Sequence, residues 1–186
     1  MWLEVTVFTT NILYIIFLAL QKRVGWVFGI IGSALFVWSN IEQQLYMDAS
    51  LNFYYILAGG YGYWLGGRGG EGKELSISKL PRWWIVWITV LSILLILLFG
   101  IMLHQYSHSN ISYLDATVTI LSFLATWLAT RKSIENWLVW LIADPLAIWL
   151  YILKGDKLYA ALFLVYTGMA AYGYYQWRKK MNQYAT

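Results

Sequence analysis

The sequence contains no cysteine, only two prolines and few charged residues, and each shortage excludes a class of protein. Without cysteine there is no disulfide framework, no thiolate metal site and no cysteine nucleophile. Charged residues make up 12% of the chain, whereas soluble domains average about 25%. Hydrophobic residues make up 60%, and the mean hydropathy is +0.57. This composition excludes a disordered chain and argues against a water-soluble enzyme.

Long apolar stretches are abundant, and seven of them have the roughly 17–25 residues that a bilayer-spanning helix needs. They cover residues 5–20, 25–42, 48–66, 83–103, 113–130, 135–153 and 157–177. The connections are short and polar, and only 68–82 is long enough to form a loop. The first stretch follows an acidic residue and lacks a cleavage site, so it predicts a retained helix rather than a signal peptide.

Lysine and arginine are unevenly distributed around these stretches, which predicts the orientation of the chain in the membrane. With seven spans, the first, third and fifth connections and the C-terminus share one side and carry 11 of the 13 basic residues. The opposite side carries Lys154 and Lys157. We therefore expect a cytoplasmic C-terminus and an outer N-terminus. This clustering also accounts for the net charge of +4 without a nucleic-acid partner.

The sequence aligns on itself without a gap when it is shifted by 111 residues, and 15 of 64 aligned positions are identical. The matches include two tryptophan pairs, a tyrosine pair and a Tyr-Gly-Tyr tripeptide: Trp26 with Trp137, Trp38 with Trp149, Tyr55 with Tyr166, and 61–63 with 172–174. Chance coincidence of apolar residues would not readily supply these pairs in one register. The chain therefore contains an internal repeat.

The repeat predicts an all-α integral membrane protein with three helices, one linker helix and three more helices. Residues 1–67 would form the first repeat, 83–103 the linker and 112–177 the second repeat, with the loop 68–82 and the tail 178–186 in the cytoplasm. Both repeats then have the same orientation, related by a pseudo-twofold axis along the membrane normal. Two bundles with a pathway between them favour a transporter. The alternatives are a membrane anchor or assembly protein and a lipid-modifying membrane enzyme.

Asp144 lies midway along the sixth stretch and is the one acid deep in a membrane segment. A charge near the bilayer centre costs roughly 2.5–3.5 kcal/mol on insertion scales. Helical spacing puts Trp137, Trp140 and Tyr151 on the same face. An acid among aromatic rings suits an organic cation, through charge pairing and cation–π contact. The alternative is a hydrogen-bonded packing aspartate beside Pro145, whose missing N–H frees a carbonyl group.

Further polar and aromatic residues lie on faces that would meet between the two bundles. They are Trp26 and Asn40 in the second stretch, Asn52 and Tyr55 in the third, Thr119 and Ser122 in the fifth, and Tyr166 in the seventh. Thr119 and Ser122 belong to a polar stripe that begins at Asp115, and facing stripes would line a cavity. The alternatives are packing for the aromatic residues, a helix-end cap for Asn40, and helix-to-helix hydrogen bonds for Ser and Thr.

We expect no metal, no cofactor and no enzymatic activity. His104 and His108 fall in an expected outer loop without a third ligand. The glycine-rich run 66–73 resembles a phosphate-binding loop, but Glu74 stands where that loop needs Ser or Thr, so a flexible linker is the better interpretation.

Several motifs, spread over nearly the whole chain, are specific enough to compare with a known family. The most specific is Ile-Glu-Asn-Trp-Leu-Val-Trp at 134–140, followed by Asp144 and by Tyr-Ile-Leu-Lys-Gly at 151–155. Gly-Trp-Val-Phe-Gly at 25–29 and the Tyr-Gly-Tyr tripeptides add to it. Together they resemble the Pnu family of bacterial vitamin transporters, of the nicotinamide riboside transporter type.

The resemblance implies two three-helix bundles joined by one helix, an enlarged form of the SWEET sugar-transporter plan, in homotrimers of the bacterial inner membrane. It implies facilitated diffusion of a vitamin that a cytoplasmic kinase then traps by phosphorylation. It places Asn136, Trp137 and Trp140 at the substrate site, whereas the position of Asp144 carries asparagine as well as aspartate in the family. Nicotinamide riboside is the first expectation for the substrate. Thiamine stays open as a second aromatic cation, and the neutral riboflavin fits an acid–aromatic face less well.

Overall fold

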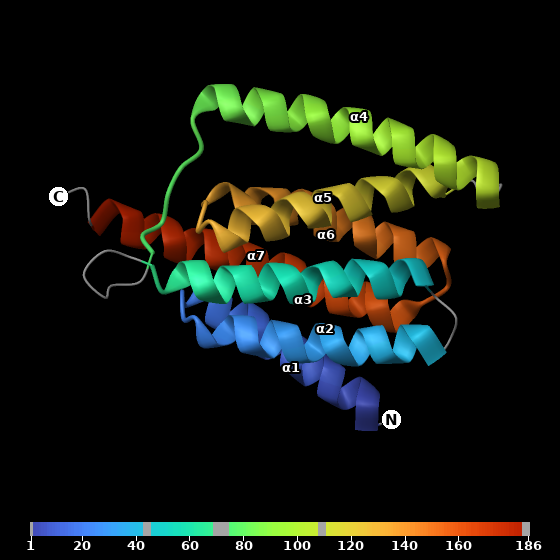
Figure 1. Cartoon of the computed structure of the whole chain (residues 1–186), viewed down its shortest axis with the longest axis horizontal. Helices are drawn as coiled ribbons and strands as arrows, with labels where there is room; N and C mark the ends of the chain where they lie inside the picture. The colour runs from blue at the N-terminus through green and yellow to red at the C-terminus, as the bar shows by residue number, and fades with distance from the viewer. Residues whose placement is uncertain (1, 43–45, 69–74, 108–110, 184–186) are drawn as a thin grey trace.

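The computed structural model describes residues 2–42, 46–68, 75–107 and 111–183, and seven helices lie within these ranges (Figure 1). The helices are α1 Trp2–Ala19, α2 Val24–Glu42, α3 Tyr46–Gly66, α4 Arg82–Ser107, α5 Ser112–Thr130, α6 Glu135–Leu153 and α7 Lys157–Gln183. Each corresponds to one of the seven apolar stretches of the sequence.

Two helices extend beyond the stretches expected from the sequence. Helix α4 includes His104, which was expected in a loop, and α7 continues from the expected end at residue 177 to Gln183. The extension of α7 carries Arg, Lys and Met, which are good helix formers. Apolar length therefore marks where a helix can lie in a membrane, whereas propensity decides where it ends.

Within the described residues, three helices are long and apolar enough to cross a membrane by length and composition. These segments are Arg82–Tyr106, Ser112–Thr130 and Glu135–Leu153. Helices α1 and α2 contain shorter apolar segments, Thr6–Ala19 and Val24–Ser39. In α7, the lysines, glycines and many tyrosines lower the mean hydropathy of a helix that is otherwise long enough.

The helices pack as two neighbouring sets. Helix α2 lies between α1 and α3, and α6 lies between α5 and α7. The two sets meet where α1 packs against α7 and where α3 packs against α5. Among the described helices, α4 packs against α5 alone and stands apart from the others in Figure 1.

The connections divide between the two ends of the molecule. The α1–α2 turn, the segment 75–81, the α5–α6 turn and the C-terminal end of α7 lie at one end (Figure 1). We call it the basic end, because it carries most of the arginines and lysines. The α6–α7 turn, with Lys154 and Asp156, lies at the opposite end.

The α1–α2 and α5–α6 turns have the same backbone geometry, 111 residues apart. Gln21 and Lys132 adopt positive φ angles of 61° and 49°. The hydrogen bonds match as well: Gln21 N–H to Leu18 O and Lys22 N–H to Phe17 O, and Lys132 N–H to Ala129 O and Ser133 N–H to Leu128 O. This is the Schellman pattern that ends helices, with a non-glycine residue in the left-handed position. Such a residue costs about 1–2 kcal/mol.

The segment 75–81, which was expected as part of a loop, is fixed to the α5–α6 turn. Ser78 N–H donates to Lys132 O at 2.9 Å, and Ile134 N–H donates to Ser78 O at 3.0 Å. Leu80 N–H donates to a carboxylate oxygen of Glu135 at 3.2 Å. The chain between α3 and α4 is therefore held across the basic end of the second set of helices.

A tryptophan-rich core closes the basic end. The Trp137 and Trp177 rings meet edge to face, with centroids 5.5 Å apart. Trp177 is fully buried, and its Nε1–H donates to the carbonyl oxygens of Leu18 and Ala19 at 3.3 and 3.1 Å. These carbonyls end α1, so the indole satisfies backbone acceptors that the helix leaves unpaired.

Candidate functional site

A cavity of about 440 Å³ lies between the two sets of helices. All the described helices except α4 contribute to its wall. It extends from Trp26 and Trp137 towards the opposite end, where Asp115, Lys154 and Asp156 line it. Its volume falls within the roughly 300–1,000 Å³ of small-molecule sites.

Helix α6 gives the cavity its most distinctive wall. Trp137, Trp140 and Asp144 line it, at the three- and four-residue spacing that keeps side chains on one helix face. Asp144 is 2% exposed, and its Oδ1 has no hydrogen-bond partner among the described residues. A buried carboxylate oxygen without a partner is costly, so this geometry is suited to a ligand that supplies a donor or a positive charge.

Asn136, the first residue of the Asn-Trp-x-x-Trp run, is not part of the cavity wall. It is fully buried at the start of α6, and its Nδ2 donates to Ser133 O at 2.7 Å. Its Oδ1 has no partner within the described part of the chain. In this conformation Asn136 holds the α5–α6 turn to α6.

The other residues proposed from the sequence come from four further helices. Trp26, Asn52, Tyr55, Thr119, Ser122 and Tyr166 all line the cavity. The side chain of Asn40 lies outside the described residues. Nine of the eleven residues proposed from the sequence therefore face one cavity, although they are spread over the chain from residue 26 to residue 166.

The cavity also contains aromatic residues that the sequence analysis did not assign to it. Tyr151 stacks on Tyr159 with ring centroids 5.0 Å apart and on Phe163 with centroids 5.4 Å apart. Tyr14 of α1 lines the cavity as well and packs against Trp26. Aromatic rings are also common in lipid-facing and core positions, so the sequence offered no signal that would separate these from the rest.

A salt bridge lies at the rim of the cavity. Lys154 Nζ is 2.9 Å from Asp115 Oδ2, and both side chains are more than one-third exposed, at 37% and 38%. The same ammonium lies 5.7 Å from the centre of the Tyr151 ring. The one lysine of the wall is therefore neutralised at the rim, while Asp144 lies deeper.

Two glycines hold the tryptophans at the inner end of the cavity. A Cβ atom built at Gly62 would lie 2.5 Å from the Trp26 indole, and one at Gly173 would lie 2.6 Å from the Trp137 indole. Optimal contacts between carbon atoms are about 3.5–4.0 Å. Each indole therefore occupies the space of an absent side chain, and both pairs sit at positions 111 residues apart.

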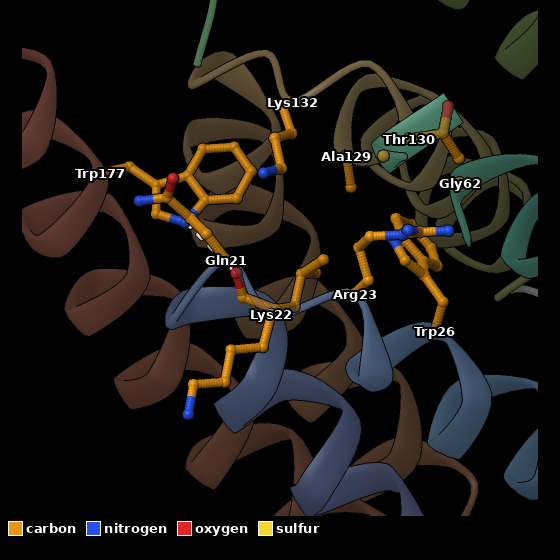
Figure 2. Close-up of a pocket in the computed structure, with 11 residues that line it drawn as sticks. Gln21, Lys22, Arg23, Trp26, Gly62, Ala129, Thr130, Lys132 and Trp177 are labelled. Carbon is orange, nitrogen blue, oxygen red and sulfur yellow. Dashed lines mark hydrogen bonds between the residues drawn. The ribbon is translucent and has the colours of Figure 1, made fainter. Parts of the chain in front are cut away.

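Beyond these indoles, at the basic end, lies a second and much smaller pocket of about 10 Å³ (Figure 2). Trp26 borders both the cavity and this pocket. In Figure 2, Arg23 lies beside Trp26, and Lys132 points down between Trp177 and the α1–α2 turn. The tryptophan layer therefore separates the cavity from a basic surface. Among the described residues there is no group of three His, Asp or Glu side chains that could hold a metal ion.

Comparison with known proteins relates this architecture to transporters. The chain is 24% identical over 202 residues to the nicotinamide riboside transporter PnuC of Escherichia coli (strain K12), covering 95% of this chain and 84% of the relative. It is also 24% identical over 198 residues to the nicotinamide riboside transporter PnuC of Neisseria mucosa, covering 99% and 74%. A crystal structure of the vitamin B3 transporter PnuC has the same fold, with a TM-score of 0.78 at 21% identity over 98% of this chain and 83% of that one.

A family model described as nicotinamide mononucleotide transporter matches residues 1–179, almost the whole chain. The relatives and the fold are those of transporters and not of enzymes. The chain belongs to the nicotinamide mononucleotide transporter family.

Proposed function

We propose that the chain is a membrane transporter that carries nicotinamide riboside by facilitated diffusion. The observation that supports this best is the cavity between the two sets of helices, with aromatic walls and the unpartnered Asp144 oxygen. Nicotinamide riboside carries a positively charged aromatic ring. A ring face can lie on an aromatic side chain, and the charge can pair with the carboxylate.

The contact with the ring is assigned to Trp140 rather than Trp137. Trp137 is 2% exposed and packs on Gly173 and Trp177, so its ring face is covered. Trp140, one helical turn further, is only partly buried and lines the same cavity. Tyr55 and Tyr166, at equivalent positions of the repeat, line the walls nearby.

The charges of the wall favour the riboside over the mononucleotide after which the family model is described. Three carboxyl groups line the cavity, those of Asp115, Asp144 and Asp156, together with Lys154. Lys154 is already paired with Asp115. A phosphate group would bring further negative charge into this wall, and like charges repel.

We also propose the 3+1+3 arrangement of seven membrane spans, with a cytoplasmic basic end in the bacterial inner membrane. The matching turns at Gln21 and Lys132 and the matching Trp–Gly pairs support two copies of one unit. Helix α4, which packs only on α5 among the described helices, is suited to the role of a linker. The cavity then faces outwards. Trapping by a cytoplasmic kinase and assembly into homotrimers follow from the family resemblance.

Binding to the purified protein in lipid nanodiscs tests the proposal. We expect nicotinamide riboside to bind more tightly than its neutral dihydro form and more tightly than nicotinamide mononucleotide. Thiamine is included as the second aromatic cation, and riboflavin as a neutral vitamin. Uptake of labelled nicotinamide riboside into liposomes should follow its gradient without an added energy source. Preference for the mononucleotide, or tighter binding of riboflavin, would contradict the assignment.

A further inference from the structure

The two indoles at the inner end of the cavity form a matched pair, one from each half of the chain. Trp26 lies in α2 and is seated on Gly62 of α3, whereas Trp137 lies in α6 and is seated on Gly173 of α7. A shift of 111 residues carries each partner of the first pair onto the corresponding partner of the second. Both indoles are nearly buried, at 6% and 2% exposure.

This pair lies where a transport path must be interrupted. Both indoles border the cavity on one side, and Trp26 also borders the small pocket at the basic end. Figure 2 shows Trp26 and Gly62 on one side of that pocket and Trp177 on the other. A substrate that leaves the cavity towards the basic end has to pass this tryptophan layer.

We propose that Trp26 and Trp137 are the two leaves of an inner gate, and that Gly62 and Gly173 are the positioning residues that keep the gate closed. Each glycine lets an indole lie directly against the backbone of the neighbouring helix, which withdraws the ring from the cavity and seals the layer behind it. The gate assignment builds on the transport function proposed above, but its test requires no vitamin.

The geometry defines the perturbation. An alanine at Gly62 or Gly173 would put a methyl group 2.5–2.6 Å from rigid indole carbons, which lie in the ring rather than at the end of a flexible chain. The indole has to move away from its seat, and the closed layer loses its packing. Overpacking of this kind typically costs about 1–3 kcal/mol, which corresponds to a shift of roughly 5- to 150-fold between closed and open gate.

The chain contains no cysteine, so a single introduced thiol can report on access to the cavity. Thr126 lines the cavity and is 4% exposed, which makes Thr126→Cys a suitable reporter. The protein is reconstituted in oriented vesicles, and a membrane-impermeant thiol reagent is added on one side or the other. We expect Gly62→Ala and Gly173→Ala to accelerate labelling from the basic end by about 5- to 150-fold, and to leave labelling from the opposite end unchanged.

The controls are two other glycines of the same helices. A Cβ at Gly60 of α3 or at Gly168 of α7 would meet nothing within 4 Å, so Gly60→Ala and Gly168→Ala should label like the parent reporter. Trp137→Phe provides a second route to the same result, because a smaller ring also leaves the layer open. Combined with Gly173→Ala, it should restore part of the packing and label more slowly than either single change.

The outcomes separate the gate from a general role in packing. Equal labelling of the Gly173→Ala and Gly168→Ala variants would overturn the proposal, as would acceleration from both ends alike. If the alanine variants do not fold, unchanged labelling of Trp137→Phe would overturn it in the same way. Failure of the vitamin to bind, together with the expected labelling pattern, would remove the substrate assignment and leave the gate standing.

Discussion

Replacement of Asp144 by asparagine is the most direct test of how the cavity recognises its ligand. The substitution keeps the shape of the side chain and removes its charge. Asp144 is 2% exposed, its Oδ1 has no partner among the described residues, and the lysine that shares the cavity is paired with Asp115. A ligand cation would therefore be the counter-charge that the site otherwise lacks.

The magnitude follows from this geometry. Hydrogen bonds and pairs that involve a charged group contribute about 1.5–3 kcal/mol, so Asp144→Asn should weaken binding of nicotinamide riboside roughly 10- to 150-fold. The neutral dihydro form makes no charge pair, and its affinity should change by about threefold or less, the scale of a small difference between neutral hydrogen bonds. The selectivity between the two ligands, rather than either affinity alone, carries the prediction.

Isothermal titration of both ligands to the parent and variant proteins measures this selectivity, with thermal unfolding as the check that the variant is folded. Asp115→Asn is a matched control, since it removes a carboxylate that is exposed and already paired with Lys154. Its effect should be smaller and should fade as salt is added, because exposed charges are screened. If Asp144→Asn leaves the selectivity unchanged, Asp144 is a neutral packing residue and charge pairing is eliminated.

Two further predictions address the ring contact and the orientation. Trp140→Ala should weaken binding of the riboside roughly 5- to 150-fold, from a loss of about 1–3 kcal/mol of stacking, and titration of a folded variant with undiminished affinity would refute the contact. A green fluorescent protein fused after residue 186 should be fluorescent, and alkaline phosphatase at the same place inactive, because both report a cytoplasmic C-terminus; the reverse pattern would invert the proposed topology.

The helices and one wall of the cavity could be predicted from the sequence because their signals are local. Seven apolar stretches identified seven helices, and a three- and four-residue spacing grouped Trp137, Trp140 and Asp144. The repeat added information that no single stretch contains, since it related Trp26 to Trp137 before any contact was known. The eventual seats of these indoles, Gly62 and Gly173, lay in the tripeptides that revealed the repeat.

The remaining aromatic wall could not be predicted, for a physical reason. In a membrane protein, lipid, protein core and an aromatic cavity are all apolar surroundings, so hydrophobic periodicity does not distinguish the faces of a helix that is apolar all round. Tyr14, Tyr151 and Tyr159 are examples. The pairing of Ser78 with the α5–α6 turn was missed because its hydrogen bonds are between backbone groups and leave no mark in the side-chain pattern.

The two left-handed turns at Gln21 and Lys132 also constrain how the chain can change in length. Each turn connects its helices without slack, so it fixes the rotation of α2 about its own axis relative to α1, and of α6 relative to α5. One residue inserted there would turn the following helix by about 100°, the angle of one residue in a helix with 3.6 per turn. Trp26 would then leave Gly62, or Trp137 leave Gly173. Insertions and deletions should therefore be tolerated least in two of the shortest connections of the molecule.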